Sequence, residues 1–145
     1  MNDEELIALL EEERTVTCAT LGANGRPHLM PLWYVPEGSE MLAWTFAKSQ
    51  KARNLERDPH ATLQVEAGEE YSELRGAMLE CDVELERDTD RIARLGLALM
   101  RRYTVGASDQ DLEAGVRAQA PKRIGMRFRP TRAVTWDHRK LGDTY

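Results

Sequence analysis

The sequence contains no apolar run that approaches the roughly 20 residues needed for a membrane-spanning helix. Its first segment, MNDEELIALLEEER, is acidic where a secretory signal would be basic. The 145 residues also show no internal repeat, linker or low-complexity segment. We therefore expect a soluble, cytoplasmic protein with a single domain, residues 1–145, whose core is large enough to need no disulfide or metal.

Cysteine is scarce, because the chain has only Cys18 and Cys81. Both lie in apolar, strand-like stretches, far from any CxxC or Cys/His metal spacing. The histidines His28, His60 and His138 lie on different predicted elements without metal-ligand spacing. We expect two buried free thiols without a chemical role, and no metal site.

Short catalytic motifs are missing as well. The chain has no nucleophile elbow, no HExxH, no GxGxxG and no P-loop, so the common hydrolase and nucleotide-binding classes lose support. Twenty Lys and Arg against 25 Asp and Glu give a net charge of −5, which argues against general nucleic-acid binding. Any anion-binding site must therefore be local.

The patterns that are present predict six strands and four helices. Helices are expected at 2–13, from Ser49 to Asp58, from Asp88, and at 108–120, and strands at 15–21, 27–35, 40–47, 60–67, 71–85 and 123–136. Regular βαβ alternation is missing, so the order favours an antiparallel α+β barrel or sheet. Pro31 lies inside the second strand and predicts an edge, bulge or opening, where ligands often approach. Gly76 marks either a bulge or a close backbone approach.

The stretch SQKARNLERDPHATL, residues 49–63, places cations at the wrong end of a helix. Ser49 is a typical N-cap, and the positive end of a helix favours acidic residues rather than Lys51 and Arg53. Free backbone N–H groups together with these cations are typical of a phosphate site. A solvated amphipathic helix is the alternative from local composition.

Four stretches together carry a family resemblance that covers nearly the whole chain: TVTCATLGANGRPHLMPLWYV, WTFAKSQKARNLERDPHATLQVE, YSELRGAMLECDVEL and KRIGMRFRPTRAVTWDHRKLG. The chain resembles the pyridoxamine 5′-phosphate oxidase-like split β-barrel superfamily. Within it, the chain is most similar to the actinobacterial flavin- and deazaflavin-dependent oxidoreductases of the B group.

The resemblance implies a six-stranded antiparallel split β-barrel with peripheral helices. It also implies a homodimer with two cofactor sites in clefts between the subunits. The phosphate would lie at Ser49, Gln50 and Lys51, with Arg53 close by. The ring system would lie along the second and third strands and near the fifth, at His28, Leu29, Met30, Pro31, Leu32, Trp33, Thr45, Phe46, Arg75 and Gly76.

The stretches SQKARNL and WDHRKLG resemble those of proteins that use coenzyme F420, so the resemblance implies F420 as the cofactor, with FMN as the alternative. True pyridoxamine phosphate oxidases carry basic residues at both ends of the second-strand segment, where this chain has His28 and Trp33, so vitamin B6 oxidation is disfavoured. The several-fold anionic tail of F420 needs a basic track, which one segment offers in Lys48, Lys51, Arg53 and Arg57. Hydride transfer to a small conjugated or unsaturated substrate then needs no catalytic side chain. A non-catalytic flavin carrier and, more distantly, a haem-related protein stay open.

Four aromatic residues could shape an apolar substrate pocket: Trp33, Trp44, Tyr71 and Trp136. Core packing or a dimer interface explains them equally well. The ending WDHRKLGDTY, with Trp136, His138, Arg139 and Lys140, either covers the cofactor or orders the dimer, unless it is a disordered terminus.

Overall fold

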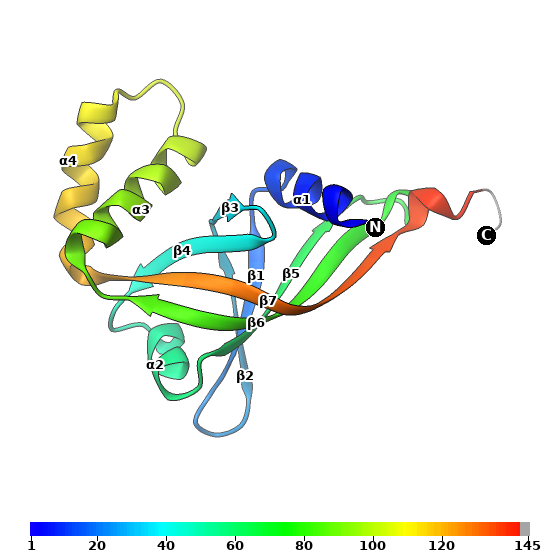
Figure 1. Ribbon diagram of the computed structural model, residues 1–145, viewed down its shortest axis with the longest axis horizontal. Coiled ribbons are helices and arrows are strands. Elements are labelled where there is room, and N and C mark those ends of the chain that lie inside the picture. Colours follow the sequence, from blue (N-terminus) through cyan, green and yellow to red (C-terminus); the bar gives the residue numbers. More distant parts are fainter. Residues whose placement is uncertain (143–145) are drawn as a thin grey trace.

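The computed structural model describes residues 1–142, and one curled antiparallel sheet of seven strands forms its centre (Figure 1). The strands are β1 (Val16–Leu21), β2 (Pro27–Leu32), β3 (Val35–Glu37), β4 (Glu40–Phe46), β5 (His60–Ala67), β6 (Arg75–Glu86) and β7 (Arg123–Asp137). Their spatial order is β2-β1-β5-β6-β7-β4-β3. The predicted α+β split-barrel fold is confirmed.

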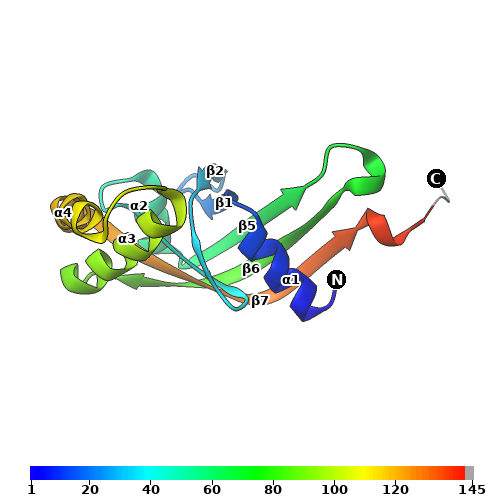
Figure 2. The ribbon, with the colours of Figure 1, turned by 90° about the horizontal axis from the view of Figure 1, so that it is seen from above.

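Within residues 1–142, four α-helices and three short 3-10 helices accompany the sheet. They are α1 (Asp3–Glu12), α2 (Gln50–Arg57), α3 (Thr89–Tyr103), α4 (Asp109–Gln119), η1 (Tyr71–Glu73), η2 (Ala120–Lys122) and η3 (His138–Lys140). Figures 1 and 2 show α1 crossing one face of the sheet, whereas α2, α3 and α4 lie at the opposite end of the molecule from the two termini. No helix among residues 1–142 has the length and hydropathy needed to cross a membrane.

The predicted count of six strands is wrong by one, because the expected strand 27–35 is two strands. β2 ends at Leu32 and β3 begins at Val35. Between them, Tyr34 leaves the sheet ladder: its N–H donates to the Tyr103 hydroxyl at 3.1 Å and its own hydroxyl donates to the Leu10 carbonyl at 2.7 Å. The chain thus passes from one edge strand of the curled sheet to the other within two residues.

The two longest strands, β6 and β7, pair along most of their length. Their register shifts between Glu80 and Cys81, so the bulge does not fall at Gly76. Gly76 instead permits a close approach, because a Cβ there would lie 2.4 Å from Cζ2 of Trp136 and 2.7 Å from the Val65 carbonyl oxygen. The expected strand 71–85 begins only at Arg75, since η1 occupies its first residues.

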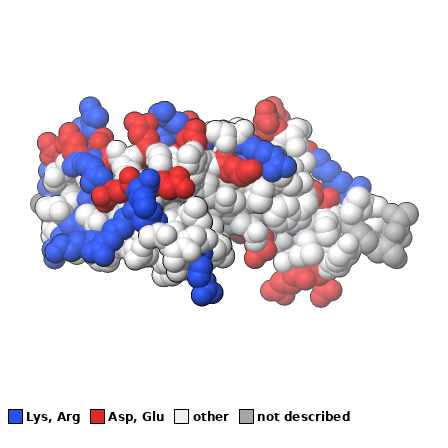
Figure 3. All heavy atoms as spheres, turned by 90° about the horizontal axis from the view of Figure 1, so that it is seen from below, with Lys and Arg blue, Asp and Glu red and all other residues white. Residues whose placement is uncertain are grey.

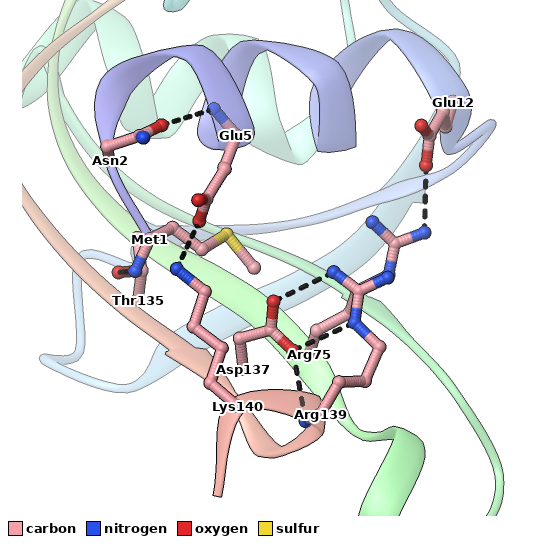
Figure 4. Close-up of polar contacts among 9 residues, drawn as sticks. All are labelled: Met1, Asn2, Glu5, Glu12, Arg75, Thr135, Asp137, Arg139 and Lys140. Carbon is pink, nitrogen blue, oxygen red and sulfur yellow. Dashed lines mark hydrogen bonds and ion pairs between the residues drawn. The ribbon is translucent and has the colours of Figure 1, made fainter.

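Polar contacts join α1 to the far ends of β6 and β7 (Figure 4). Lys140 Nζ lies 2.7 Å from Glu5 Oε2, Arg75 Nη2 lies 2.8 Å from Glu12 Oε2, and the Met1 amine donates to Thr135 Oγ1 at 3.2 Å. The described part of the tail, as far as residue 142, is therefore tied to the N-terminal helix. Its last three residues lie outside the described chain.

The main core lies inside the curled sheet and under α1. Its largest fully buried side chains include Tyr34, Phe128, Leu9, Leu10 and Met41. The free thiols of Cys18 and Cys81 are buried in this core, as predicted. Burial raises the pKa of Cys18 to about 11 and that of Cys81 to about 12, so both are protonated at neutral pH.

Candidate functional site

The start of α2 is built by the turn that follows β4. Ser49 is the N-cap, and its Oγ accepts a hydrogen bond from the Ala52 N–H at 3.1 Å. Thr45, near the end of β4, donates its hydroxyl to the same oxygen at 3.2 Å. The N–H groups of Gln50 and Lys51 bond to no other described residue. Free N–H groups at a capped helix start are donors of the type that the sequence led us to expect for a phosphate, and that role stays a prediction.

Lys51 is buried rather than displayed on the helix surface. Its exposed fraction is 6%. Burial lowers the pKa of its ammonium, and the electrostatic interaction with Cys18 acts in the opposite direction. No carboxylate of residues 1–142 forms an ion pair with it. A buried lysine without a counter-ion is costly, because desolvation penalises the charged form.

The side of α2 that faces β1 is fixed by a buried amide. Asn54 donates to Thr20 Oγ1 at 3.1 Å and accepts hydrogen bonds from Gln50 Nε2 at 2.8 Å and Arg57 Nη2 at 3.2 Å. Arg57 also donates to the Leu21 carbonyl at 2.6 Å. Gln50 and Arg57 thus have structural partners, whereas Arg53 is exposed and forms no ion pair among the described residues.

A pocket of about 660 Å³ opens beside this helix start. Strand β2 and the residue after it contribute Pro31, Leu32 and Trp33, and β4 contributes Trp44 and Thr45. The rest of its lining consists of Thr15, Leu99, Met100, Gln119 and Arg123. The pocket therefore has mainly apolar walls, and Thr45 connects it to the N-cap of α2.

Arg123, the first residue of β7, supplies the charge in this pocket. It pairs with Phe46 in the sheet, and its guanidinium carbon lies 3.7 Å from the centroid of the Phe46 ring and 4.9 Å from that of Trp44. Its Nε is buried without a hydrogen-bond partner, and burial lowers the pKa of the side chain. Among residues 1–142, the one hydrogen bond of its side chain is a long one, 3.5 Å from Nη2 to Gln119 Oε1.

Trp44 takes its position in the pocket wall from a glycine on α3. A Cβ at Gly96 would lie 2.2 Å from Cζ3 of Trp44. Only glycine gives the indole room against the helix at this point, since no real Cβ atom approaches another group so closely. The pair therefore fixes both the helix packing and the shape of the pocket.

A second hollow, of about 380 Å³, lies on the other side of α2. It is lined by the hairpin loop between β1 and β2 together with His28, Gln50 and Asn54. The Nδ1 atom of His28 is buried without a hydrogen-bond partner. A polar group bound here could satisfy that nitrogen.

Most of the residues predicted for the cofactor fall into two groups, the larger pocket and the start of α2, which the hydrogen bond between Thr45 and Ser49 connects. Pro31, Leu32, Trp33 and Thr45 line the larger pocket with Phe46 beside Arg123, and Ser49, Gln50, Lys51 and Arg53 form the helix start. His28 lines the smaller hollow, whereas Leu29 and Met30 are exposed on edge strand β2. Arg75 and Gly76 lie at the other end of the molecule, where Arg75 pairs with Glu12 and Gly76 seats Trp136. The cofactor roles of these residues stay predictions.

Exposed cations follow the elements that meet at the start of α2. Lys48, Arg53 and Lys122 are exposed, and none of them forms an ion pair with a described carboxylate. Figure 3 shows Lys and Arg side chains along the lower left of the face seen from below, together with acidic ones, at the end that carries α2, α3 and α4. The backbone links the segments of Lys48 and Lys122, because the Ala47 N–H donates to the Lys122 carbonyl at 2.9 Å.

Sequence reasoning missed Arg123, Tyr103 and the pocket residues of α3. The sequence KRIGM gives no sign that Arg123 lacks a counter-ion, because its position depends on pairing between β4 and β7. The three histidines have separate environments: His60 lies 2.6 Å from Asp58, and His138 Nδ1 lies 2.7 Å from the Tyr71 carbonyl. Among residues 1–142, no group of three or more His, Cys, Asp or Glu side chains could hold a metal ion.

Comparison with known proteins identifies one family. The family model described as pyridoxamine 5′-phosphate oxidase matches residues 3–137, and the chain belongs to this family. The resemblance inferred from the sequence is thus confirmed.

Solved structures add relatives with the same fold. A conserved hypothetical protein from Mycobacterium tuberculosis is 37% identical, with a TM-score of 0.91, and the similarity covers 100% of this chain and 90% of that one. A structure named F420 reductase is 23% identical, with a TM-score of 0.68 and coverage of 88% and 94%. The heme storage protein HutZ from Vibrio cholerae is 19% identical, with a TM-score of 0.70 and coverage of 94% and 95%. No curated protein matched the sequence.

Proposed function

We propose that the chain is an F420-dependent oxidoreductase that transfers a hydride between the deazaflavin and a small conjugated or unsaturated substrate. The observation that carries the proposal is two cations without a counter-ion among residues 1–142: Lys51 in the first turn of α2, and Arg123 beside Phe46, the last residue of β4. Both cations are partly or wholly desolvated, so an anion bound between them would offset a cost that the free protein bears.

The donors at this turn match what a phosphate group needs. The N–H groups of Gln50 and Lys51, the Ser49 hydroxyl and the Lys51 ammonium supply hydrogen bonds and positive charge at a helix start. Arg123 adds a planar donor in the adjoining pocket. A flavin-type cofactor with a phosphate therefore fits the residues that are present.

F420 is favoured over FMN by the exposed cations beyond this phosphate site. Lys48, Arg53 and Lys122 would meet the acidic tail of F420, whereas FMN ends at its phosphate. When bound, the deazaflavin supplies hydride at ring C5. The chain's own residues position the ring between β2 and β4, and Trp33, Trp44, Leu99 and Met100 keep water from the pocket.

A second copy of the chain completes the proposed site. Edge strand β2 exposes Leu29 at 58% and Met30 at 47%, and Trp33 and Phe46 are also about half exposed. Exposed large apolar side chains on the edge strand β2, with Trp33 directly after it and Phe46 at the end of β4, favour a covered surface over isolated surface residues. We propose that a homodimer covers them and places the cofactor in a cleft between two subunits.

Fluorescence and absorption titrations of the purified protein with F420, FMN and haemin test this function. We expect F420 to bind more tightly than FMN, and Arg53→Ala to weaken F420 binding more than FMN binding. Oxidation of reduced F420 by an added quinone or enone in the presence of the protein would then establish turnover. Binding of haemin alone, or of no cofactor, would contradict the proposal.

A further inference from the structure

Trp33 forms a stacked pair with Tyr103, the last residue of α3. The ring centroids lie 4.5 Å apart and the ring planes differ by 6°. Trp33 itself lies in the two-residue segment between β2 and β3, where the backbone leaves the sheet. A residue in such a segment has few local restraints, so the ring of Tyr103 largely determines where the indole lies.

Tyr103 is in turn held firmly through its hydroxyl. The hydroxyl accepts hydrogen bonds from the Tyr34 N–H at 3.1 Å and from Arg102 Nη1, and it lies 2.7 Å from the Arg14 carbonyl, to which it donates. Arg102 also donates to the carbonyls of Tyr34 and Glu13, both at 2.7 Å. The Tyr103 hydroxyl therefore ties the end of α3 to two other segments, at Tyr34 and at Arg14, and the ring provides a rigid support for Trp33.

The supported indole is a wall of the larger pocket. Trp33 lines that pocket and is 51% exposed, although Tyr103 covers one of its two faces. Trp44 contributes a second flat wall, seated on Gly96, and Arg123 contributes a cation whose Nε has no partner. The pocket thus combines flat apolar surfaces with one unneutralised charge.

Resting on the proposed function, we infer that Tyr103 is a positioning residue that fixes Trp33 as a stacking surface, so that the pocket selects a flat conjugated ring with an anionic substituent directed toward Arg123. The ring belongs either to the cofactor or to the substrate. Both sources share this chemistry, and both would gain from stacking on a side chain that is already ordered before binding.

The test compares two carboxylates that differ in ring planarity, 2-naphthoate and cyclohexanecarboxylate, by calorimetric titration of the full chain. We expect the wild type to prefer 2-naphthoate. Trp33→Leu and Tyr103→Leu should each weaken 2-naphthoate about three- to tenfold, the range of one aromatic stacking contact, and leave cyclohexanecarboxylate unchanged. Arg123→Gln should weaken both ligands. The matched control Tyr71→Leu removes an exposed tyrosine outside the pocket and should change neither.

A wild-type protein without preference between the two carboxylates would overturn the inference, and so would Trp33 and Tyr103 variants that weaken both equally. If Tyr103→Leu does not fold, the comparison of the two carboxylates is made with Trp33→Leu, which changes a half-exposed side chain: equal weakening of both ligands in this variant would overturn the inference. Competition with F420 distinguishes the sources. Mutual exclusion assigns the ring to the cofactor, whereas simultaneous binding assigns both the ring and Arg123 to the substrate and leaves Lys51 as the cation of the cofactor phosphate. Selective naphthoate binding without binding of any cofactor would contradict the proposed function while the inference stands.

Discussion

The guanidinium carbon of Arg123 lies 3.7 Å from the centre of the Phe46 ring, its pairing partner across β4 and β7. This contact holds the cation by its flat face and leaves its N–H edge directed elsewhere. No carboxylate of residues 1–142 forms an ion pair with Arg123. The pairing of β4 with β7 therefore places the unneutralised Arg123 guanidinium beside Phe46, three residues before the N-cap of α2.

Arg123→Gln should lower the affinity for F420 and FMN about tenfold or more, because a charge-assisted hydrogen bond to a phosphate is lost. Arg123→Lys should recover only part of it, since an ammonium cannot replace the planar donor pair. Fluorescence titration measures both. The control is Arg94→Gln, an exposed arginine that lines a different hollow, with Glu84 and Glu86. Equal affinity in wild type and Arg123→Gln would show that the cation serves packing alone.

Lys51→Met should stabilise the protein without ligand and weaken phosphate binding. The substitution removes a desolvated charge but keeps the apolar stem, so urea unfolding should shift to higher concentration. Cofactor affinity should fall by about ten- to a hundredfold, as expected for one charged hydrogen bond. The control is Arg53→Ala, which changes an exposed cation two residues later in the same helix and should leave stability unchanged. A variant that loses stability and keeps its affinity would mean that Lys51 supports the fold.

Local signals predicted the helices well because their caps lie next to them in sequence. Asn2, Ser49, Asp88 and Ser108 each accept a hydrogen bond from a first-turn N–H, as their residue types suggest. The break at Trp33 and Tyr34 was not predictable in this way. The break depends on hydrogen bonds from Tyr34 to Tyr103, about 70 residues later, and to Leu10 in α1. No pattern within residues 27–35 predicts either partner.

The site shows the same division between local and distant causes. The phosphate hypothesis came from Ser49, Lys51 and Arg53, which are neighbours in sequence. The structure confirms Ser49 as the N-cap, but it buries Lys51 and leaves Arg53 exposed. Arg75 matched a family position, but its guanidinium meets Glu12, which lies 63 residues earlier. Arg123 had no local signal at all, because a cation becomes notable only when the fold removes its counter-ions and water.

Gly96→Ala should destabilise the protein although alanine favours a helix by about 1 kcal/mol over glycine. The new Cβ would lie 2.2 Å from Trp44 Cζ3, so the indole must move, at a cost of about 1–3 kcal/mol typical of overpacking. Urea unfolding measures the loss. Adding Trp44→Leu should recover most of it, because the smaller side chain leaves room. A double variant no better than Gly96→Ala would place the strain elsewhere.

Met30→Glu should convert the proposed dimer into a monomer. Met30 is 47% exposed on edge strand β2, so a charge there costs the single chain little but would be buried unpaired in an interface. Sedimentation at low micromolar concentration measures the change, and cofactor affinity should fall with it. The control is Glu84→Met, which lies on β6, the central strand of the sheet order. A wild-type chain that sediments as a monomer and binds cofactor fully would contradict the shared cleft.

The stability of the protein should fall as the pH rises above the ordinary range of thiols. Burial raises the pKa of Cys18 to about 11 and that of Cys81 to about 12. In that window the unfolded chain releases thiol protons that the native chain retains, so the native state binds more protons and stability decreases with pH. Each thiol should cost about 1 kcal/mol by about pH 10.

Lys51 acts in the opposite direction, because its pKa is lowered and the unfolded chain then binds more protons than the native one. The measurement is therefore made in the Lys51→Met background, with and without Cys18→Ala and Cys81→Ala. Urea unfolding at about pH 8 and about pH 10 should show a smaller loss in the alanine variants. Their F420 affinity at neutral pH should equal that of the parent, since two protonated core thiols take no part in binding. An unchanged alkaline loss would assign the titration to other groups, and a lost cofactor would give the cysteines a role that burial does not predict.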